Sequence, residues 1–225
     1  MRPIAVLFDA GNTLVHLDYA RLAAGVGDAL AIPLTAAELE AAAGPAALAM
    51  EQQHLRTDRE RGSAFLVELF MRVGVPSDRM DVLRDTLLHM HQQQHLWATN
   101  DPRIGGALER LRAAGYRLGV VSNSDGRAAS ALAACGLLAH FEIVIDSGEV
   151  GIEKPDPRIF ALALERMGVA PDDAIYVGDL YEVDVVGARA AGLDVVLLDP
   201  YGVHADRDVI RARDVLEVAE LLLAA

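Results

Sequence analysis

The stretch that most constrains this chain runs from Ile4 to Thr13, near its start. It begins with an unbroken apolar run through Phe8, the pattern of a strand that is buried on both faces of a parallel sheet. Asp9 follows directly, and Gly11 and Asn12 are residues typical of a tight turn. Ligands bind at the carboxyl ends of the strands in an open α/β sheet, so the sequence predicts that Asp9 lies at a functional site.

Strands and helices alternate along the second half of the chain. The apolar runs predict strands at residues 116–121, 141–145, 174–177 and 194–198. Helices are predicted to begin at Asp101, Asp125 and Asp156, after Asp179 and at Asp214, and most of them end at a glycine. Such alternation predicts an α/β fold, a doubly wound, Rossmann-like parallel sheet that helices cover on both faces.

The stretch from Leu17 to Trp97 is helical in pattern, with no convincing strand. Helices are predicted at residues 18–29, 35–55, 62–73 and 77–97. Consecutive helices joined by short turns indicate a small bundle. Because the opening strand belongs to the sheet, we predict an α/β core of residues 1–15 and 99–225, with an all-helical cap inserted at residues 16–98.

Charge and composition limit the partners of the protein. The formal net charge of −13 argues against a nucleic acid or an anionic membrane, because both require a basic surface. Cys135 is the only cysteine, so no intramolecular disulfide can form. We expect no signal peptide, and no segment approaches the roughly 20 apolar residues that span a bilayer, so a cytoplasmic protein is predicted. Alanine-rich helices at residues 38–55 and 127–134 leave both a monomer and a homodimer open.

Two predicted strands end in polar residues that suit chemistry. Asp9 follows the first strand, with Thr13 in the turn behind it. Ser122 and Asn123 end a later strand, where a hydroxyl and an amide could hold the oxygens of an anion.

Two further places carry charge at constrained positions. Lys154, the only lysine of the chain, precedes a proline that restricts the backbone. Asp179 and Asp184 lie on either side of a predicted strand-to-helix turn that starts at Gly178. Carboxylates in a loop suit Mg²⁺, which prefers oxygen ligands.

These four places, in this order along one sheet, resemble the four motifs of the haloacid dehalogenase superfamily. That superfamily consists mostly of phosphatases that use an aspartate nucleophile. The resemblance covers the whole predicted core, and the helical insertion after the first strand lies where the family places its commonest cap.

The resemblance implies a role for each residue toward a small phosphorylated substrate. Asp9 would be the nucleophile, and Thr13 would steady its loop. Ser122 and Asn123 would bind the transferred phosphoryl group, and Lys154 would neutralise it.

The resemblance also implies a Mg²⁺ ion. Asp9, Asp179 and the backbone carbonyl of Gly11 would ligate the ion, with Asp184 in support through water or Lys154. Charge supports a metal independently, because each pair of like charges at ~4 Å costs about 4 kcal/mol at an effective dielectric near 20. An anionic substrate among these carboxylates therefore requires a cation.

The match fails at Gly11. Phosphatases of the family usually carry a second Asp there, which protonates the leaving group and later activates water. Such general acid–base help is worth about 10²- to 10⁴-fold in rate. We therefore expect a phosphatase that is slow or limited to good leaving groups, unless another residue such as His16 supplies the proton.

Other functions are weighed against this one. A dehalogenase that attacks carbon needs no acid at Gly11, but dehalogenases of the family work without metal and lack the acidic turn at Asp179. A phosphonatase-like enzyme needs a lysine in the cap, and the predicted cap contains none. A protein that binds phosphate and metal without turnover is the remaining alternative.

The predicted cap carries polar groups that fit more than one role. His91 and His95 have the i,i+4 spacing that could hold a metal on one helix face, although a solvated polar face is the simpler interpretation. His95 and Trp97 could instead contact the substrate. The arginines at positions 56, 59 and 61 are predicted to lie at a surface turn between helices, where they could meet a substrate anion.

Overall fold

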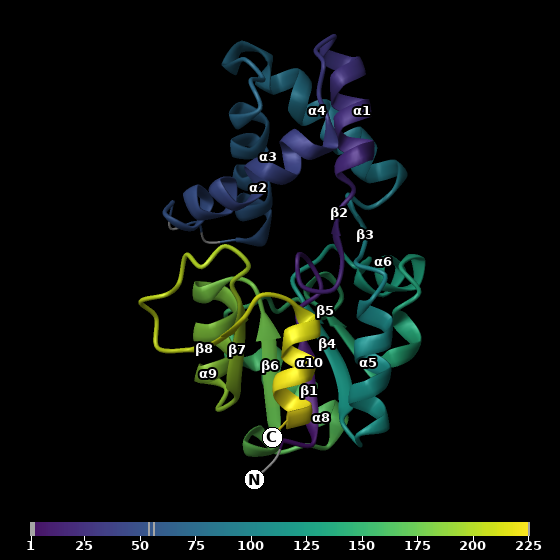
Figure 1. The fold of residues 1–225 in the computed structure, drawn as a ribbon, viewed down its shortest axis with the longest axis vertical. Coiled ribbons are helices and arrows are strands. Elements are labelled where there is room, and N and C mark those ends of the chain that lie inside the picture. The colour runs from purple at the N-terminus through teal and green to yellow at the C-terminus, as the bar shows by residue number, and fades with distance from the viewer. Residues whose placement is uncertain (1–2, 54, 56, 225) are drawn as a thin grey trace. The chain divides into compact units, whose positions relative to one another are not determined.

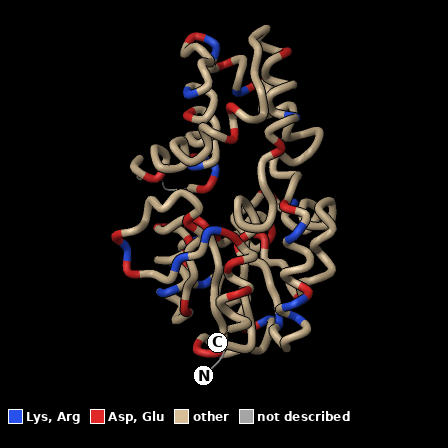
Figure 2. The backbone as a smooth tube through the Cα atoms, in the orientation of Figure 1, with Lys and Arg blue, Asp and Glu red and all other residues tan. Residues whose placement is uncertain are grey.

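The computed structural model describes residues 3–53, 55 and 57–224. The chain divides into two compact units, Met1–His16 with Thr99–Ala225, and Leu17–Ala98 (Figure 1). The first unit is built on a sheet and the second on helices. Acidic residues are distributed through both units in Figure 2, in keeping with the net charge of −13.

A six-stranded sheet in the described residues forms the centre of the first unit, and every strand pair in it is parallel. Its order is β5-β4-β1-β6-β7-β8. The strands are β1 (Ala5–Phe8), β4 (Arg117–Ser122), β5 (Ile143–Asp146), β6 (Ala174–Gly178), β7 (Asp194–Leu198) and β8 (Ile210–Ala212). The chain moves outward from β1 through β4 and β5, then returns to β6 and moves outward the other way. This confirms the predicted doubly wound sheet and puts its switch point at the end of β1.

Helices cover the sheet on both faces. They are α5 (Ile104–Ala113), α6 (Ala128–Ala134), α7 (Ser147–Val150), α8 (Pro157–Met167), α9 (Val186–Ala190) and α10 (Val215–Ala224). Helices α8 and α9 pack on one face through a buried cluster that includes Leu7, Phe160 and Tyr176. Helix α10 lies in front of the sheet in Figure 1, with α5 in contact with it. Since all of β1 is buried, its unbroken apolar pattern is explained.

The second unit holds the four predicted helices in its described part. They are α1 (Tyr19–Leu30), α2 (Ala36–Glu51), α3 (Asp58–Arg72) and α4 (Met80–Gln93), the last preceded by a short 3₁₀ turn at Ser77–Arg79. Thr35 and Glu38 form the predicted capping box, in which each side chain binds the other residue's backbone N–H. None of the helices in the described part of the chain is long and apolar enough to cross a membrane.

Three short strands were not predicted. β2 (His16–Leu17) and β3 (Trp97–Thr99) pair with each other, in a region expected to contain no strand. β8 adds an edge to the sheet beyond the strand taken as the last. Each of the three is two or three residues long, too short for a periodic pattern to be recognised.

Several predicted helix ends were wrong. Helix α2 ends at Glu51 instead of residue 55, and α3 begins four residues early because Thr57 and Glu60 form a second capping box. Helix α5 begins at Ile104, since the Asp101 carboxylate instead accepts hydrogen bonds from Arg103.

The start of α6 was also predicted wrongly. The helix begins at Ala128, and the carboxylate that accepts the Ala128 N–H belongs to Asp146, at 2.9 Å, and not to Asp125. Asp125 instead pairs with Arg127 at 2.6 Å.

Candidate active site

Three of the predicted side chains meet in a buried cluster at the carboxyl edge of the sheet. The Lys154 Nζ atom lies 2.6 Å from Asp9 Oδ1 and 2.8 Å from Asp184 Oδ1. Its third partner is the hydroxyl of Tyr176, at 2.9 Å. Every proton of the ammonium group therefore has an acceptor. Sequence reasoning missed Tyr176, because an aromatic residue inside an apolar strand has the pattern of the core.

The loop after β1 positions Asp9 and closes as a tight turn. The Asp9 N–H donates to the Val177 carbonyl at 2.8 Å and so extends the pairing of β1 with β6. Leu14 N donates to the Ala10 carbonyl at 2.8 Å. Asn12 has a φ of 54°, a left-handed conformation that asparagine adopts more readily than most residues. The turn that Gly11 and Asn12 predicted is present.

Thr13 lies inside this turn. Its side chain is buried, and among the described residues its Oγ1 has no hydrogen-bond partner. The role that the resemblance implies for Thr13, steadying the loop, stays a prediction.

The end of β4 brings Ser122 and Asn123 to the same edge. Val120 is the register partner of Phe8, so Ser122 lies beyond the end of β1 on the neighbouring strand. Ser122 is buried, and its Oγ is 3.5 Å from the Asn123 carbonyl, the outer limit of a hydrogen bond. Both atoms of the Asn123 amide bind the backbone of Lys154, Oδ1 accepting from its N–H at 2.8 Å and Nδ2 donating to its carbonyl at 3.0 Å. Asn123 therefore holds the lysine segment in place.

Asp146, a residue not singled out from the sequence, fixes the loop beyond Asn123. Its buried carboxylate accepts hydrogen bonds from the backbone N–H groups of Gly126, Ala128 and Gly148, at 2.9 to 3.0 Å. A buried carboxylate without a cation is stable only when hydrogen bonds replace its water. Asp146 thus joins the loops after β4 and β5.

Asp184 organises the turn after β6. Its Oδ2 accepts from the N–H groups of Asp179 at 3.1 Å and Leu180 at 2.9 Å, and its Oδ1 binds Lys154 and Tyr176. The side chain is 1% exposed, and both of its oxygens are engaged. Asp184 was predicted to support a metal through water or Lys154, and it does contact Lys154 at 2.8 Å. Its part in a metal site stays a prediction.

Gly178 makes this arrangement possible. A Cβ atom built on Gly178 would lie 2.6 Å from Asp184 Oδ2, inside the space that the carboxylate fills. Gly178→Ala is therefore expected to lower the free energy of unfolding by about 1–3 kcal/mol, because the carboxylate must leave its place or the strand must shift. Denaturant unfolding measures this change.

Gly106→Ala is the matched control for that substitution. A Cβ at Gly106, in helix α5, meets nothing within 4 Å. The change should stabilise the protein by about 0.5–1 kcal/mol, because alanine loses less backbone entropy in a helix. Equal effects at the two glycines would contradict the role given to Gly178.

The electrostatics of the cluster show an excess of negative charge. Burial, outweighing the pull of Lys154, raises the pKa of Asp9 to about 6. Burial and the charges of Asp9 and Asp184 raise the pKa of Asp179 well above its usual value. Burial alone would lower the pKa of Lys154, but Asp184 and Asp9 outweigh it and hold that pKa well above normal. Carboxylates this reluctant to ionise would be relieved by a further cation, and their hard oxygens fit Mg²⁺.

His16 is the residue that the sequence offered as a substitute for the missing acid. Burial, only partly offset by the charge of Asp101, lowers the pKa of the His16 ring, so the ring is neutral at pH 7. Within the described residues, no hydrogen bond joins this ring to Asp9 or Lys154. Its part as a proton donor stays a prediction from the sequence.

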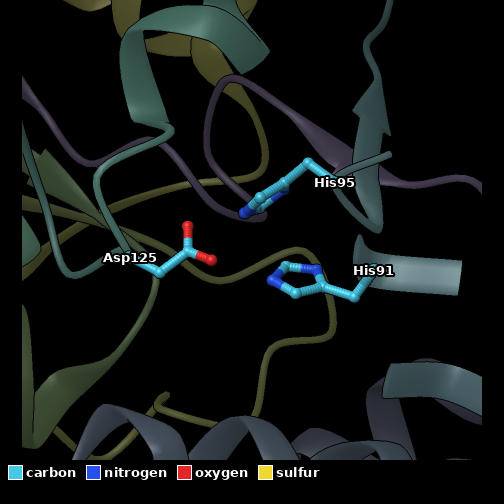
Figure 3. A group of neighbouring side chains, drawn as sticks. All are labelled: His91, His95 and Asp125. Atoms are coloured by element: carbon cyan, nitrogen blue, oxygen red, sulfur yellow. The ribbon is translucent and has the colours of Figure 1, made fainter. Parts of the chain in front are cut away.

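The histidines of the helical unit differ from their predicted placement. Helix α4 ends at Gln93 and Gln94 is extended, so His91 and His95 do not share a helix face. Their rings nevertheless lie side by side, with centroids 4.8 Å apart (Figure 3). His95 also lies against Trp97, with ring centroids 5.9 Å apart.

Two of the arginines predicted at a surface turn lie in a helix. Arg59 and Arg61 are in the first turn of α3, and Arg61 is buried with a hydrogen bond to the Leu55 carbonyl at 3.3 Å. Arg56 lies outside the described residues.

Comparison with known proteins supplies the family. A family model described as haloacid dehalogenase-like hydrolase matches residues 5–192. The mouse protein "Haloacid dehalogenase-like hydrolase domain-containing protein 3" is 36% identical over 146 residues, which are 63% of this chain and 57% of that protein. The phosphoserine phosphatase of Thermus thermophilus is 41% identical over 122 residues, 52% of this chain and 49% of the relative. The chain spans about half the length of the curated relatives it matches.

A solved structure agrees with the fold over nearly the whole chain. A dehalogenase with an intermediate complex superposes with a TM-score of 0.66 at 22% identity, covering 98% of this chain and 97% of its own. At that identity the likeness shows the fold alone. The family model spans all four of the places that the sequence singled out. The chain therefore belongs to the haloacid dehalogenase-like hydrolases.

Proposed function

We propose that this protein is a Mg²⁺-dependent phosphatase that acts on a small phosphorylated metabolite. The contact between Asp9 and Lys154 carries the proposal, since an ammonium group lies 2.6 Å from a carboxylate oxygen. A carboxylate that attacks phosphorus needs a positive charge beside it, because the transferred phosphoryl group brings negative charge to the same place. One relative, the phosphoserine phosphatase of Thermus thermophilus, bears the name of an enzyme with this chemistry, which supports the proposal.

In the proposed reaction, Asp9 forms a bond to phosphorus while the bond to the leaving oxygen breaks, which gives an aspartyl-phosphate. Water then attacks the phosphorus, restores the Asp9 carboxylate and releases phosphate. Lys154 neutralises the phosphoryl oxygens, and the Ser122 hydroxyl donates to one of them. Mg²⁺ held by Asp9, Asp179 and the Gly11 carbonyl would offset the negative charge of the carboxylates and the phosphoryl group.

Three further residues hold the reacting groups or their loops in position. Asn123 binds the backbone on both sides of Lys154, so it contributes to phosphoryl binding by fixing the lysine. Asp184 shapes the turn that presents Asp179. Thr13 keeps the loop after Asp9 packed.

In the proposed reaction, the leaving group departs with little help from a proton donor. Gly11 has no side chain to give a proton, and the lowered pKa of His16 leaves that ring neutral. Without general acid help, the rate depends on the stability of the departing oxyanion. We therefore propose that activated esters, such as aryl phosphates, react much faster than alkyl phosphates.

Two alternatives from the sequence have distinct outcomes. A protein that binds phosphate and metal without turnover would bind phosphate in the presence of Mg²⁺ but release none. A hydrolase that attacks carbon would release halide from a haloacid without Mg²⁺. The cytoplasmic location, and the choice between a monomer and a homodimer, stay predictions from the sequence.

Phosphate release from a panel of phosphomonoesters, including p-nitrophenyl phosphate, tests the proposal. We expect release that requires Mg²⁺, stops with chelator and is strongest for the aryl ester. Release that is unaffected by chelator, or that favours alkyl over aryl esters, would contradict the mechanism. No release from any ester, together with Mg²⁺-dependent phosphate binding in calorimetry, would establish the binding protein instead.

A further inference from the structure

The hydroxyl of Tyr176 lies at the centre of the buried cluster. It is 2.9 Å from Lys154 Nζ, 3.1 Å from Asp184 Oδ1 and 3.1 Å from the Val121 carbonyl. We propose that Tyr176 is a positioning residue that keeps the Lys154 ammonium aimed at the phosphoryl group throughout turnover. This inference rests on the proposed phosphatase function.

The position of the hydroxyl is set by packing, independently of the lysine. Tyr176 is fully buried in β6, between β1 and β7. Its ring makes an edge contact with Phe160 of α8, with centroids 4.9 Å apart and planes at 80°. A ring held by the sheet on one side and by a helix on the other presents its hydroxyl at one fixed point.

The protons of the cluster can be assigned one by one. The Lys154 ammonium has three protons, and its three acceptors are Asp9, Asp184 and the Tyr176 oxygen. The phenol therefore accepts from the lysine and has a single proton to donate, toward either the Val121 carbonyl or Asp184. When the hydroxyl donates to the Val121 carbonyl, it links Lys154 to β4, the strand that ends at Ser122.

This arrangement gives the tyrosine a specific use in the reaction. When the substrate binds, a phosphoryl oxygen must accept the hydrogen bond that the Lys154 ammonium donates to Asp9 in the free protein. Asp184 and Tyr176 then remain as the anchors of a long and flexible side chain. With the hydroxyl removed, only Asp184 would restrain the ammonium, and misplacing such a charge slows the chemical step more than it weakens substrate binding.

Tyr176→Phe, compared with Tyr116→Phe, tests the inference by kinetics. Tyr116 is the matched control, because it is also buried and its hydroxyl donates to a backbone carbonyl, that of Leu222 at 2.8 Å, outside the cluster. We expect Tyr176→Phe to lower kcat for p-nitrophenyl phosphate by about 10- to 100-fold with KM changed less than about threefold. Tyr116→Phe should leave both constants within about twofold.

A second readout is independent of activity. Lys154 is the only lysine, so labelling with ¹⁵Nζ-lysine gives one side-chain signal in an NMR spectrum. We expect a slowly exchanging ammonium signal in the wild type and in Tyr116→Phe. In Tyr176→Phe this signal should shift or broaden, while the amide spectrum stays that of a folded protein.

The outcomes separate this inference from the proposed function. If the wild type turns over esters and Tyr176→Phe keeps its kcat within twofold, the inference is overturned and the phosphatase stands. If the wild type is inactive, the phosphatase proposal fails and the NMR signal still decides whether Tyr176 holds Lys154. Should Tyr176→Phe not fold, the wild type itself gives the answer, since the absence of a nuclear Overhauser effect between the ammonium protons and the Tyr176 ring would overturn the inference.

Discussion

Asp9→Asn should abolish turnover of an activated phosphate ester, with kcat lower by a factor on the order of 10⁴ or more. Loss of a covalent nucleophile has effects of this size, because the remaining groups still bind the substrate but form no covalent intermediate. Asparagine keeps an oxygen that can accept the Lys154 hydrogen bond, which measures 2.6 Å in the structure. Steady-state kinetics at saturating Mg²⁺ measure the loss.

Asp206→Asn is the control for this substitution, since Asp206 is exposed in the same unit. It should leave kcat unchanged. Turnover within tenfold of the wild type in Asp9→Asn would mean that another group is the nucleophile.

Asp9→Asn should also change how the free energy of unfolding depends on pH. The pKa of Asp9 is raised from 3.8 to about 6 in the metal-free folded protein, chiefly by burial. The folded state then binds the proton more tightly than the unfolded state, so the contribution of Asp9 to stability is complete below the unfolded pKa and is lost as the pH rises toward the folded one. The asparagine side chain of the variant does not titrate.

In chelator, the stability of Asp9→Asn relative to the wild type should therefore increase between about pH 4 and pH 7. Urea unfolding at several pH values measures the difference. Added Mg²⁺ should stabilise the wild type more than the variant. A relative stability that falls as the pH rises would show that the Asp9 pKa is not raised.

Lys154→Met should lower the free energy of unfolding by about 3–5 kcal/mol at pH 7. The substitution leaves the buried carboxylates of Asp9 and Asp184 without the ammonium that lies 2.6 and 2.8 Å from them. Removing one partner of a buried ion pair costs more than the pair contributes, because the other charge stays in a medium of low dielectric. Methionine keeps the length and much of the volume of the side chain, so packing changes little.

Arg158→Met is the control for the lysine substitution. Arg158 also pairs with an aspartate, Asp156 at 2.6 Å, but its side chain is 73% exposed. Its loss should leave the unfolding free energy close to that of the wild type, because an exposed ion pair contributes little to stability. Lowering the pH to about 4 should reduce the difference in unfolding free energy between Lys154→Met and the wild type, because protonated carboxyls carry no charge for the ammonium to balance. A deficit that is independent of pH would point to lost packing.

The sequence allowed part of the buried cluster to be predicted. Asp9 directly follows an apolar strand, and Lys154 and Asp184 lie in short polar segments that fit a known set of motifs. Tyr176 and Asp146 could not be found in this way. Their roles depend on contacts across the sheet, of Tyr176 with Val121 and of Asp146 with Ala128, and local patterns carry no information on such contacts.

A similar limit applies to Asn123 and to the fold. The amide of Asn123 was predicted to face an anion, but its partners are backbone atoms of Lys154, far along the chain. The alternation of strands and helices predicted the parallel sheet correctly, because each of the longer strands carries a full apolar run. β2, β3 and β8 have two or three residues each, so only the pairing itself distinguishes them from loops.

The central position of β1 has a consequence for the order of folding. Ala5 pairs with Arg117 on one side and with Ala174 on the other. During synthesis, β1 is made long before β4 and β6, the two strands that pair with it. The helical unit is a compact body formed by the continuous stretch Leu17–Ala98. We expect it to fold before the sheet, while β1 is still an unpaired apolar segment. Closure of the sheet around β1, with its distant pairings, should then be the slow step and the stage most exposed to aggregation.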